Sequence, residues 1–534
     1  MKPLSRDALL IAAVAALALL ARALPGPRTI DDAFITFRYS RSIVEGAGFV
    51  YNPGVQTLGT TTPLYTLLMA AFGAAFGTGA DSFPWYALTA NALADAATAA
   101  LLLLIVKRLT GNAWAGALLG ALWALSPVSV TFAVGGMETS LAILWLVAAT
   151  YMHIAGRPVW TGAFIGLGYL TRIDSLLWIA PLLLWQLGEA LNLPPANLRS
   201  AVPSPHGKGI GGEVRGWRAV WRTWLAAALV ALPWTLFAWA YFGSPVPNSV
   251  GAKTVAYALP PGSAFLRLLQ FYPIPFSEYD LFGAAGALAG LALYLPLTLV
   301  GLLFTARLLP RLLPFLFYPW LYMAAFSIAN PLIFRWYIAP PLPALMVGVL
   351  AGVWALVDAA QAARPGWKIA PATLAALALL WGATSLSGWT LHPDHGFDRP
   401  APKMAWHLIE LYYRQMAETL VNDYGVTPQT RVAAGDIGAV GYFSRAYIVD
   451  TVGLVTPEMS AYYPADPALI PEGQNYAIPP QLILDTRPDF LVTMEAFVRL
   501  GLARDSRFQA EYALVAEIPT DFYGTGMRLY QRVP

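Results

Sequence analysis

The sequence contains no cysteine and few charged residues. Because cysteine is absent from all 534 residues, a disulfide framework, thiolate chemistry and a cysteine metal site are excluded. Only 12% of the residues are charged, whereas about 25% is usual for a soluble domain. The net charge of +3 is too small to indicate nucleic-acid binding. With 57% hydrophobic residues and a mean hydropathy of +0.55, the composition indicates an integral membrane protein.

An internal repeat is also lacking, which argues against a transporter built from two related halves. Aromatic residues, in contrast, are common. The 19 tryptophans and 25 tyrosines fit the aromatic belts at the two faces of a membrane better than stacking on nucleobases.

Apolar segments and the basic loops between them predict about eleven membrane spans. The first, 8–24, is a span or a signal peptide, and we favour a span with a cytoplasmic N-terminus. Lys107 and Arg108 end the span 85–106, and the loop 189–222 is basic, so both belong on the cytoplasmic side. The other predicted spans are 112–134, 139–155, 159–171, 175–188, 223–242, 281–306, 312–329, 337–357 and 369–388.

The apolar segment 62–77 is too short to be one of these spans. It has 16 residues, whereas a span needs about 20. If it crossed the membrane, Lys107 and Arg108 would lie on the wrong side. We therefore predict a juxtamembrane or re-entrant helix, with 25–84 as one large extracytoplasmic loop.

The composition changes near residue 389, which divides the chain into two predicted domains. Residues 1–388 form the transmembrane domain, and 389–534 form a soluble α/β domain on the extracytoplasmic side. In the second domain we predict strands at 431–434, 447–449, 490–493 and 512–516, and a helix at 403–422.

Two adjacent carboxylates, Asp31 and Asp32, follow the first span. Charges so close to lipid are costly unless they have a function. Thr29 and Asp32 have the spacing of a capping box, which predicts a helix that starts there. On this helix Asp31, Arg38 and Arg41 share a face. The alternative is that the acids only stabilise the helix N-terminus.

Charged residues at the outer ends of the predicted spans suit glycosyl transfer. A carboxylate can take the proton of the acceptor hydroxyl, and cations can stabilise a departing phosphate. Because no nucleotide is available outside the cell, the activated sugar would be carried by a lipid. The candidate residues are Asp31, Asp32, Arg38, Arg41, Glu138, Arg172, Asp174, Lys253 and Arg335.

Most of these residues also have a purely structural interpretation. Arg172 and Asp174 can pair at a helix end, and Arg335 can anchor the chain at the membrane interface. Glu138 can stabilise a helix N-terminus, and Lys253 can be a solvated loop charge.

Two further features lie outside this set. Asp95, inside a predicted span, has either a buried hydrogen bond or a function. The run Gly435-Asp436-Ile437-Gly438 follows a predicted strand, but its spacing is not that of a dinucleotide-binding loop. We interpret it as a tight turn between a strand and a helix.

Several blocks of the sequence resemble the glycosyltransferases of the GT-C fold. This superfamily includes protein O-mannosyltransferases, lipid A aminoarabinose transferases and mycobacterial arabinofuranosyltransferases, and the terminal β-(1→2) arabinofuranosyltransferase group is the most similar. The sequence departs from the pattern at 58–61 and at Ile173-Asp174, which puts the sugar identity in doubt. The matching blocks are 31–39, 45–54, 61–65, 136–139, 170–172, 435–438, Asp450 and 453–454.

The resemblance implies an inverting transfer from a polyprenyl-phosphate sugar to a glycan, lipid or protein of the cell envelope. It implies no nucleotide cofactor. One of Asp31 and Asp32 would be the general base or a metal-linked carboxylate, and we favour Asp31 because its face also carries Arg38 and Arg41. Whether these acids hold Mg²⁺ or Mn²⁺, or transfer is metal-independent, stays open.

Two other functions compete with this hypothesis. A transporter or flippase of a lipid-linked sugar would need a cavity that also reaches the cytoplasmic side. A non-catalytic scaffold would leave the candidate residues scattered and solvated. Catalysis instead predicts Asp31 or Asp32 in a cavity near Arg172, Lys253 or Arg335.

Overall fold

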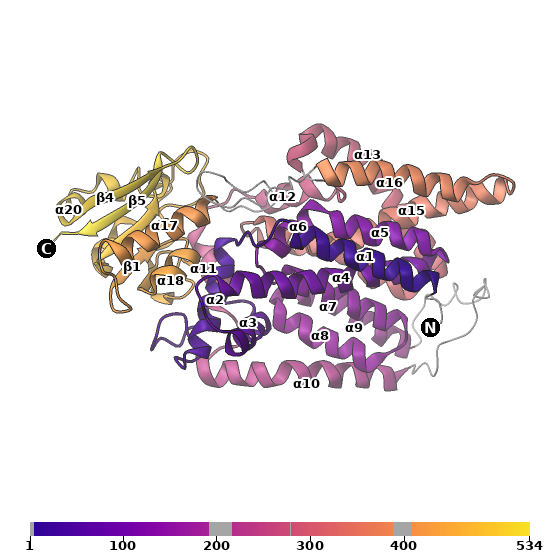
Figure 1. Cartoon of the computed structure of the whole chain (residues 1–534), viewed down its shortest axis with the longest axis horizontal. Coiled ribbons are helices and arrows are strands. Elements are labelled where there is room, and N and C mark those ends of the chain that lie inside the picture. The colour runs from indigo at the N-terminus through magenta and orange to yellow at the C-terminus, as the bar shows by residue number, and fades with distance from the viewer. Residues whose placement is uncertain (1–4, 192–215, 278, 388–407, 534) are drawn as a thin grey trace.

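The computed structural model describes residues 5–191, 216–277, 279–387 and 408–533. A helical domain is followed by an α/β domain, which we call the C-terminal domain. The C-terminal domain lies at one end of the helical domain, and the beginning of the chain lies at the opposite end (Figure 1). The predicted boundary near 388 falls outside the described residues.

Twelve helices of the helical domain correspond to the eleven predicted spans, because the segment 112–134 forms two of them. Many of these helices carry apolar side chains around their whole circumference, as expected for helices buried in protein or lipid. They are α1 (Arg6–Ala23), α4 (Ser82–Thr110), α5 (Ala113–Leu125), α6 (Pro127–Val134), α7 (Thr139–Ile154), α8 (Pro158–Thr171), α9 (Leu176–Ala190), α10 (Trp217–Phe242), α13 (Tyr279–Leu308), α14 (Leu313–Ala329), α15 (Leu342–Ala363) and α16 (Ile369–Ser387).

The predicted number of eleven spans is not confirmed. Within the described residues, six helices are long and apolar enough to cross a membrane: α4, α10, α13, α14, α15 and α16. The pair α5 and α6 makes a seventh if it is one broken span, bent by 49° at Pro127, where proline cannot donate a helical hydrogen bond. The helices α7, α8 and α9 have 16, 14 and 15 residues and are short for a span.

Exposed apolar side chains show which helices face the lipid. The apolar windows of α10 and α16 are only 11% buried, whereas those of α4 and α15 are 67% and 72% buried. Leucines and tryptophans cover the outer surface of α10, with Leu229 and Trp239 each 67% exposed. An exposed apolar surface of this size is stable when lipid hydrocarbon covers it and not when it faces water. The protein is therefore a membrane protein.

Asp95 has a partner inside the helical domain, which favours the structural interpretation. Arg22 on α1 donates to Asp95 Oδ2 at 3.0 Å, and Ser140 on α7 donates to the same oxygen at 3.0 Å. Arg22 also donates to the carbonyl of Ala124, at the break between α5 and α6. Arg22 donates to Ser129 on α6 as well, so the buried ion pair and its hydrogen bonds join α1, α4, α5, α6 and α7 around this break.

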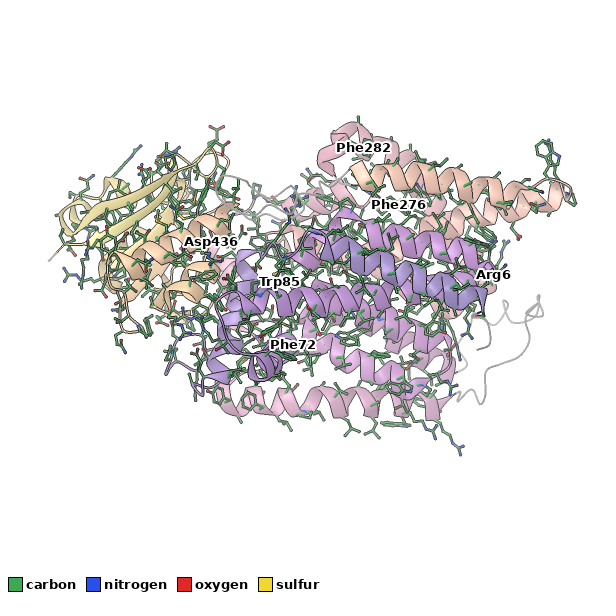
Figure 2. The ribbon with its side chains drawn as sticks, viewed as in Figure 1. Arg6, Phe72, Trp85, Phe276, Phe282 and Asp436 are labelled. Carbon is green, nitrogen blue, oxygen red and sulfur yellow. The ribbon has the colours of Figure 1, made fainter. Side chains whose placement is uncertain are left out.

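Ion pairs at the end far from the C-terminal domain join helix ends that the predicted topology places on the cytoplasmic side. Lys107 contacts Asp7, and Arg311 lies 2.8 Å from Glu189. Arg6 marks this end, and Asp436 of the C-terminal domain lies at the other (Figure 2). The orientation in the membrane stays a prediction.

Two short helices of the segment 25–84 lie next to the C-terminal domain: α2 (Asp31–Val44) and α3 (Pro63–Phe76). The predicted capping box is wrong. Helix α2 begins at Asp31 with Ile30 as its N-cap, and no side chain caps it. Helix α3 covers most of the short apolar segment and packs against α2 (Figure 1).

Two more short helices lie between α10 and α13, where a long loop was predicted. They are α11 (Asn248–Ala256) and the amphipathic α12 (Ser263–Phe271). A single 3₁₀ turn, η4 (Arg335–Tyr337), precedes α15. These elements lie at the same end of the helical domain as the C-terminal domain.

The C-terminal domain is built on a five-stranded sheet in the order β2-β1-β3-β5-β4. Strands β1, β2 and β3 are parallel, and β5 and β4 continue the sheet as an antiparallel hairpin. Four of the strands were predicted, and β5 was not. The strands are β1 (Arg431–Ala434), β2 (Tyr447–Asp450), β3 (Phe490–Met494), β4 (Tyr512–Pro519) and β5 (Gly526–Arg532).

Helices cover this sheet, and its connections place a switch in strand order beside β1. The chain runs from β1 through α18 to β2 on one side, and then crosses to β3 on the other side of β1. In open α/β sheets ligands bind at the carboxyl ends of the strands at such a point. The helices are α17 (Leu408–Asn422), α18 (Gly438–Ser444), α19 (Pro480–Thr486) and α20 (Ser506–Glu511).

Candidate functional site

A cavity of about 610 Å³ lies between the helical domain and the C-terminal domain. The helical domain contributes the start of α2, the helix α12 and the segment 331–336. The C-terminal domain contributes the turns after β1, β2 and β3, through Asp436, Val452 and Phe497. The charged residues that line the cavity are Asp31, Asp32, Arg267, Arg335, Glu410 and Asp436.

Asp32 presents its carboxylate to this cavity. Lys253 on α11 lies 3.4 Å from Asp32 Oδ2, and its ammonium lies 4.8 Å from the ring centroid of Phe334. Among the described residues, none donates a hydrogen bond to Asp32 Oδ1. Burial is the largest effect and lowers the pKa of Lys253, but the interactions with Asp32, Tyr337 and Asp450 together raise the pKa above its usual value. The pair thus combines a charged ammonium with a carboxylate that has one oxygen available.

The carboxylate of Asp31 binds the backbone of α18, whereas that of Asp32 pairs with Lys253. The two carboxylate oxygens of Asp31 accept backbone N–H bonds from Gly438 at 2.8 Å and from Ala439 at 2.7 Å. These are the first residues of α18, so Asp31 caps a helix of the C-terminal domain. Burial, together with the charge of Asp436, raises the pKa of Asp31. Although Asp31 borders the cavity, both of its oxygens are already used.

Arg38 and Arg41 lie in the interface between α2 and α18 and do not line the cavity. Arg38 donates to the carbonyl oxygens of Gly441 and Ala446, each at 2.7 Å. Arg41 donates to the carbonyl oxygen of Tyr442 at 2.8 Å.

Together with Asp31, these arginines hold both ends of α18. A carboxylate meets the positive end of the helix, and cations meet its carbonyl end. The face of α2 that was predicted to bind substrate therefore docks the C-terminal domain. The sequence could not show this contact, because Asp31 and its partner Gly438 on α18 are 407 residues apart.

Glu138, Arg172 and Asp174 form one buried ion cluster behind the cavity wall. Arg172 lies 2.7 Å from Glu138 and 2.8 Å from Asp174. The guanidinium of Arg172 also lies 5.0 Å from the ring centroid of Tyr337, at the end of η4. None of the three charged residues lines the cavity, so the structure brings them close to the site without exposing them to it.

Two arginines of the helical domain line the cavity. Arg335, which was predicted, begins η4 between Phe334 and Trp336, whose rings are stacked 4.6 Å apart. Arg267, which was not predicted, lies on α12 with its guanidinium 5.1 Å from the Phe271 ring centroid. The amphipathic pattern of α12 could have revealed it, because a basic residue on such a helix lies at the membrane surface.

Asp436 is the carboxylate that sequence reasoning interpreted only as part of a turn. It is the second residue after β1, lines the cavity and accepts a hydrogen bond from the Tyr413 hydroxyl at 2.9 Å. Burial raises the pKa of Asp436 and the nearby charge of Asp32 adds to this, whereas the bond from Tyr413 lowers it. A signal was present in the sequence, since an acid after a predicted parallel strand lies at the ligand edge of the sheet.

Glu410 on α17 is the second acid that sequence reasoning missed. Its Oε1 accepts a hydrogen bond from the backbone N–H of Asp31 at 3.2 Å. The side chain is 4% exposed, and among the described residues its Oε2 has no hydrogen-bond partner. Burial raises the pKa of Glu410, and the charge of Asp31 raises it further.

The predicted metal site at Asp31 and Asp32 does not fit the donor groups. A divalent ion needs several free carboxylate or carbonyl oxygens, and the backbone of α18 occupies both oxygens of Asp31. The described residues also contain no group of three or more histidine, aspartate or glutamate side chains that could hold an ion. We therefore derive no step through Mg²⁺ or Mn²⁺.

Sequence comparisons reach only part of the chain. A family model described as a domain of unknown function (DUF8728) matches residues 405–531, which cover the C-terminal domain. Comparison with curated proteins finds no match.

Structural comparisons extend over nearly the whole chain. ArnT from Cupriavidus metallidurans in the apo state is 14% identical with a TM-score of 0.55, and the match covers 98% of this chain and 97% of ArnT. The archaeal oligosaccharyltransferase AglB from Archaeoglobus fulgidus, in complex with an inhibitory peptide and a dolichol-phosphate, is 13% identical with a TM-score of 0.53. That match covers 98% of this chain and 74% of AglB.

The arabinofuranosyltransferase AftD from Mycobacteria is similar too, at 15% identity and a TM-score of 0.51, over 100% of this chain and 40% of AftD. ArnT has also been solved bound to undecaprenyl phosphate, and AglB in complex with Zn and sulfate. These similarities include both the helical domain and the C-terminal domain. The chain therefore has the GT-C glycosyltransferase fold that the sequence blocks predicted.

Proposed function

We propose that this protein is a membrane glycosyltransferase that moves a sugar from a polyprenyl-phosphate donor to an acceptor hydroxyl. The observation that carries the proposal is the Asp32 carboxylate, which lines the cavity between the two domains and pairs with Lys253. Arg267 and Arg335 line the same cavity. A base and cations for a phosphate thus lie together in a chain with the GT-C fold.

Asp32 is the group best placed to act as the general base. Its Oδ1 would take the proton of the acceptor hydroxyl as that oxygen attacks the anomeric carbon of the donor. The bond from this carbon to the phosphate oxygen breaks, and the polyprenyl phosphate leaves with the electron pair. Lys253 holds Asp32 Oδ2 and fixes the direction of Oδ1.

The cations of the cavity would stabilise the departing phosphate. Arginine matches phosphate geometry with two parallel N–H donors, and Arg267 and Arg335 both line the cavity. The buried cluster of Glu138, Arg172 and Asp174 supports η4 through Tyr337. Its role would be to position Arg335.

The location of the cavity supports a lipid-linked donor. It lies where the helical domain meets the C-terminal domain, at the end opposite Arg6 and the basic helix ends (Figure 2). By the positive-inside rule this end is extracytoplasmic, where the acceptor would be a glycan, lipid or protein of the cell envelope. The bound dolichol-phosphate of AglB and undecaprenyl phosphate of ArnT are ligands of the corresponding class.

Transport of a lipid-linked sugar has less support. Other cavities of the helical domain include one of about 20 Å³ beside His153 and Gln186, and one of about 680 Å³ at the turn between α15 and α16. Among the described residues, none that lines either of these two also lines the cavity between the two domains. A substrate passage would need continuous space between the two ends of the helical domain.

Transfer of radiolabelled sugar from a panel of polyprenyl-phosphate donors tests the proposal. We expect Asp32→Asn to abolish transfer by the purified, folded protein, and the exposed Asp423→Asn to leave it unchanged. Asp31→Asn should lower activity only by weakening the contact between α2 and α18 of the C-terminal domain. Full transfer by Asp32→Asn would exclude Asp32 as the base.

A further inference from the structure

We propose that Asp436 is a sugar-binding residue, through which the C-terminal domain selects the saccharide that enters the cavity. The inference rests on the proposed glycosyl transfer, and it assigns a substrate-recognition role to a domain whose family model carries no function. The ligand group is a hydroxyl of a neutral sugar ring, which belongs either to the donor or to the acceptor.

The sheet topology places Asp436 where α/β domains bind ligands. Strand β1 is central to the parallel part of the sheet, with β2 on one side and β3 on the other. The chain reverses its direction of winding between β1 and β3, and ligands bind at the carboxyl ends of strands at such a point. Asp436 is the second residue after β1, and the turns after β2 and β3 line the same cavity.

This edge of the sheet cannot bind a phosphate in the usual way. The N–H groups of Gly438 and Ala439, which would otherwise face a ligand, already donate to the carboxylate of Asp31. Asp436 adds a second carboxylate beside it, and the charge of Asp436 raises the pKa of Asp31. An anionic ligand would be repelled, so the group that binds at this edge is a neutral hydrogen-bond donor.

Asp436 is held ready to accept such a hydrogen bond. The Tyr413 hydroxyl donates to Oδ2 at 2.9 Å, and Tyr413 itself is only 1% exposed, so the carboxylate is fixed in direction. Among the described residues, none donates to Oδ1. A hydroxyl that binds there forms a charge-assisted bond without reorganisation of the site.

A buried oxygen in the same wall also lacks a hydrogen-bond partner among the described residues. Glu410 Oε2 has no hydrogen-bond partner among the described residues, although Glu410 lines the cavity and is 4% exposed. Buried polar atoms in folded proteins are nearly always paired. A bound hydroxyl or a water that accompanies it would supply the missing partner.

Aromatic rings complete a surface that suits a sugar. Tyr257 and Tyr476 line the cavity with their ring centroids 5.9 Å apart, and Phe334 and Trp336 line it as a stacked pair. Pockets of this kind combine flat apolar walls, which pack on the C–H faces of a sugar, with a few fixed polar groups that bind its hydroxyls.

The first experiment compares Michaelis constants. We expect Asp436→Ala to raise KM for one substrate by about 10- to 100-fold, the loss typical of one hydrogen bond to a charged group, with kcat within about threefold of wild type. A higher KM for the donor assigns the hydroxyl to the transferred sugar, and a higher KM for the acceptor assigns it to the acceptor. Unchanged KM values for both substrates, or a loss of kcat alone, would overturn the inference.

Matched variants separate recognition from folding and from catalysis. Tyr413→Phe keeps the ring and removes only the bond to Asp436 Oδ2, so it should raise the same KM by a smaller factor. Asp423→Asn, an exposed acid after α17, should change neither constant. Asp32→Asn should instead lower kcat.

A binding measurement separates this inference from the proposed function. Wild-type protein in nanodiscs is titrated with a polyprenyl-phosphate sugar and with the same polyprenyl phosphate without sugar, and with a soluble acceptor saccharide. The inference predicts that Asp436→Ala abolishes either the preference for the glycosylated lipid or the binding of the acceptor. If this loss occurs in a protein that never transfers sugar, the proposed function fails and the binding site stands. If wild type and variant bind all three probes equally, the inference fails.

Discussion

Replacement of Arg38 by methionine is expected to separate the C-terminal domain from α2. The Arg38 side chain is 3% exposed and donates four hydrogen bonds. Their acceptors are the carbonyl of Tyr51 at 2.8 Å, Asn52 Oδ1 at 3.1 Å, and the carbonyls of Gly441 and Ala446 at 2.7 Å each. Methionine fills part of the same space but donates none of these bonds.

The size of the effect follows from the two bonds that cross to the C-terminal domain. A hydrogen bond to a charged group contributes about 1.5–3 kcal/mol, so the bonds to Gly441 and Ala446 together stabilise docking by about 3–6 kcal/mol. A free-energy change of about 1.4 kcal/mol is a factor of ten. The equilibrium between docked and separated domains should therefore shift by about 10²- to 10⁴-fold.

Hydrogen exchange measures this shift at individual amides. The N–H groups of Gly438 and Ala439 are bound to Asp31 only when the domain is docked, so their exchange should accelerate by the same factor. The amide of Val492, in the centre of β3, reports on the sheet itself and should stay protected.

The exposed Arg445→Met is the matched control. Arg445 follows α18 and pairs with Glu45 at 3.0 Å, with its side chain 52% exposed. Such pairs contribute about 0.2–1 kcal/mol, so exchange should change by less than about fivefold. Equal exchange at Gly438 in the Arg38 and Arg445 variants would refute the reasoning, and so would equal acceleration at Val492, which would indicate unfolding.

Three further predictions concern stability. Arg22→Leu leaves Asp95 unpaired in the helical domain and should cost about 3–5 kcal/mol of unfolding free energy, and the double variant with Asp95→Leu should recover most of it in a thermal unfolding scan. Gly352→Ala should lower the melting temperature because its Cβ would overlap the Leu297 carbonyl where α13 and α15 cross, whereas Gly382→Ala has open space and should be neutral. In the unfolded chain Asp436 loses its proton near pH 3.8, whereas burial and the charge of Asp32 raise its pKa in the folded protein. Between pH 3.8 and the raised pKa of Asp436, the folded state therefore binds more protons than the unfolded state. The free energy of unfolding should fall as the pH rises through this range, and Asp436→Asn should make that fall smaller.

The sequence was sufficient for the parts of the fold that rest on local pattern. Apolar runs located the helices, and four strands of the C-terminal domain were predicted from short apolar segments between turns. The strand β5 was missed although Met527 and Leu529 alternate with polar neighbours, because it lies in a short segment near the chain end. The span count is not confirmed where helices are broken or short, as at Pro127, since composition does not show how a bent pair crosses a membrane.

The candidate site depended on contacts that no local pattern shows. The prediction placed Asp31 and Asp32 together, and the structure separates them: the helix turns by about 100° per residue, so Asp31 meets α18 while Asp32 meets Lys253. The face of α2 that carries Asp31 and Arg38 was predicted to bind substrate, and in the structure both residues contact the backbone of the distant helix α18. Asp436 was interpreted only as part of a turn, although its place after a predicted strand was a signal, because Asp31 and Asp32 in the same cavity come from the other domain.

The contacts of Asp31 with α18 also constrain how the protein is made. The carboxylate and its partner Gly438 are 407 residues apart, and at about 5–20 residues per second the ribosome needs about 20–80 s to synthesise the intervening chain. During that time α2 has no C-terminal domain to contact, and the cavity is lined only by residues of the helical domain. On the predicted topology, the candidate cavity is complete only after the C-terminal domain has been delivered across the bilayer, so a nascent chain that stalls after α16 would be inserted without a complete cavity.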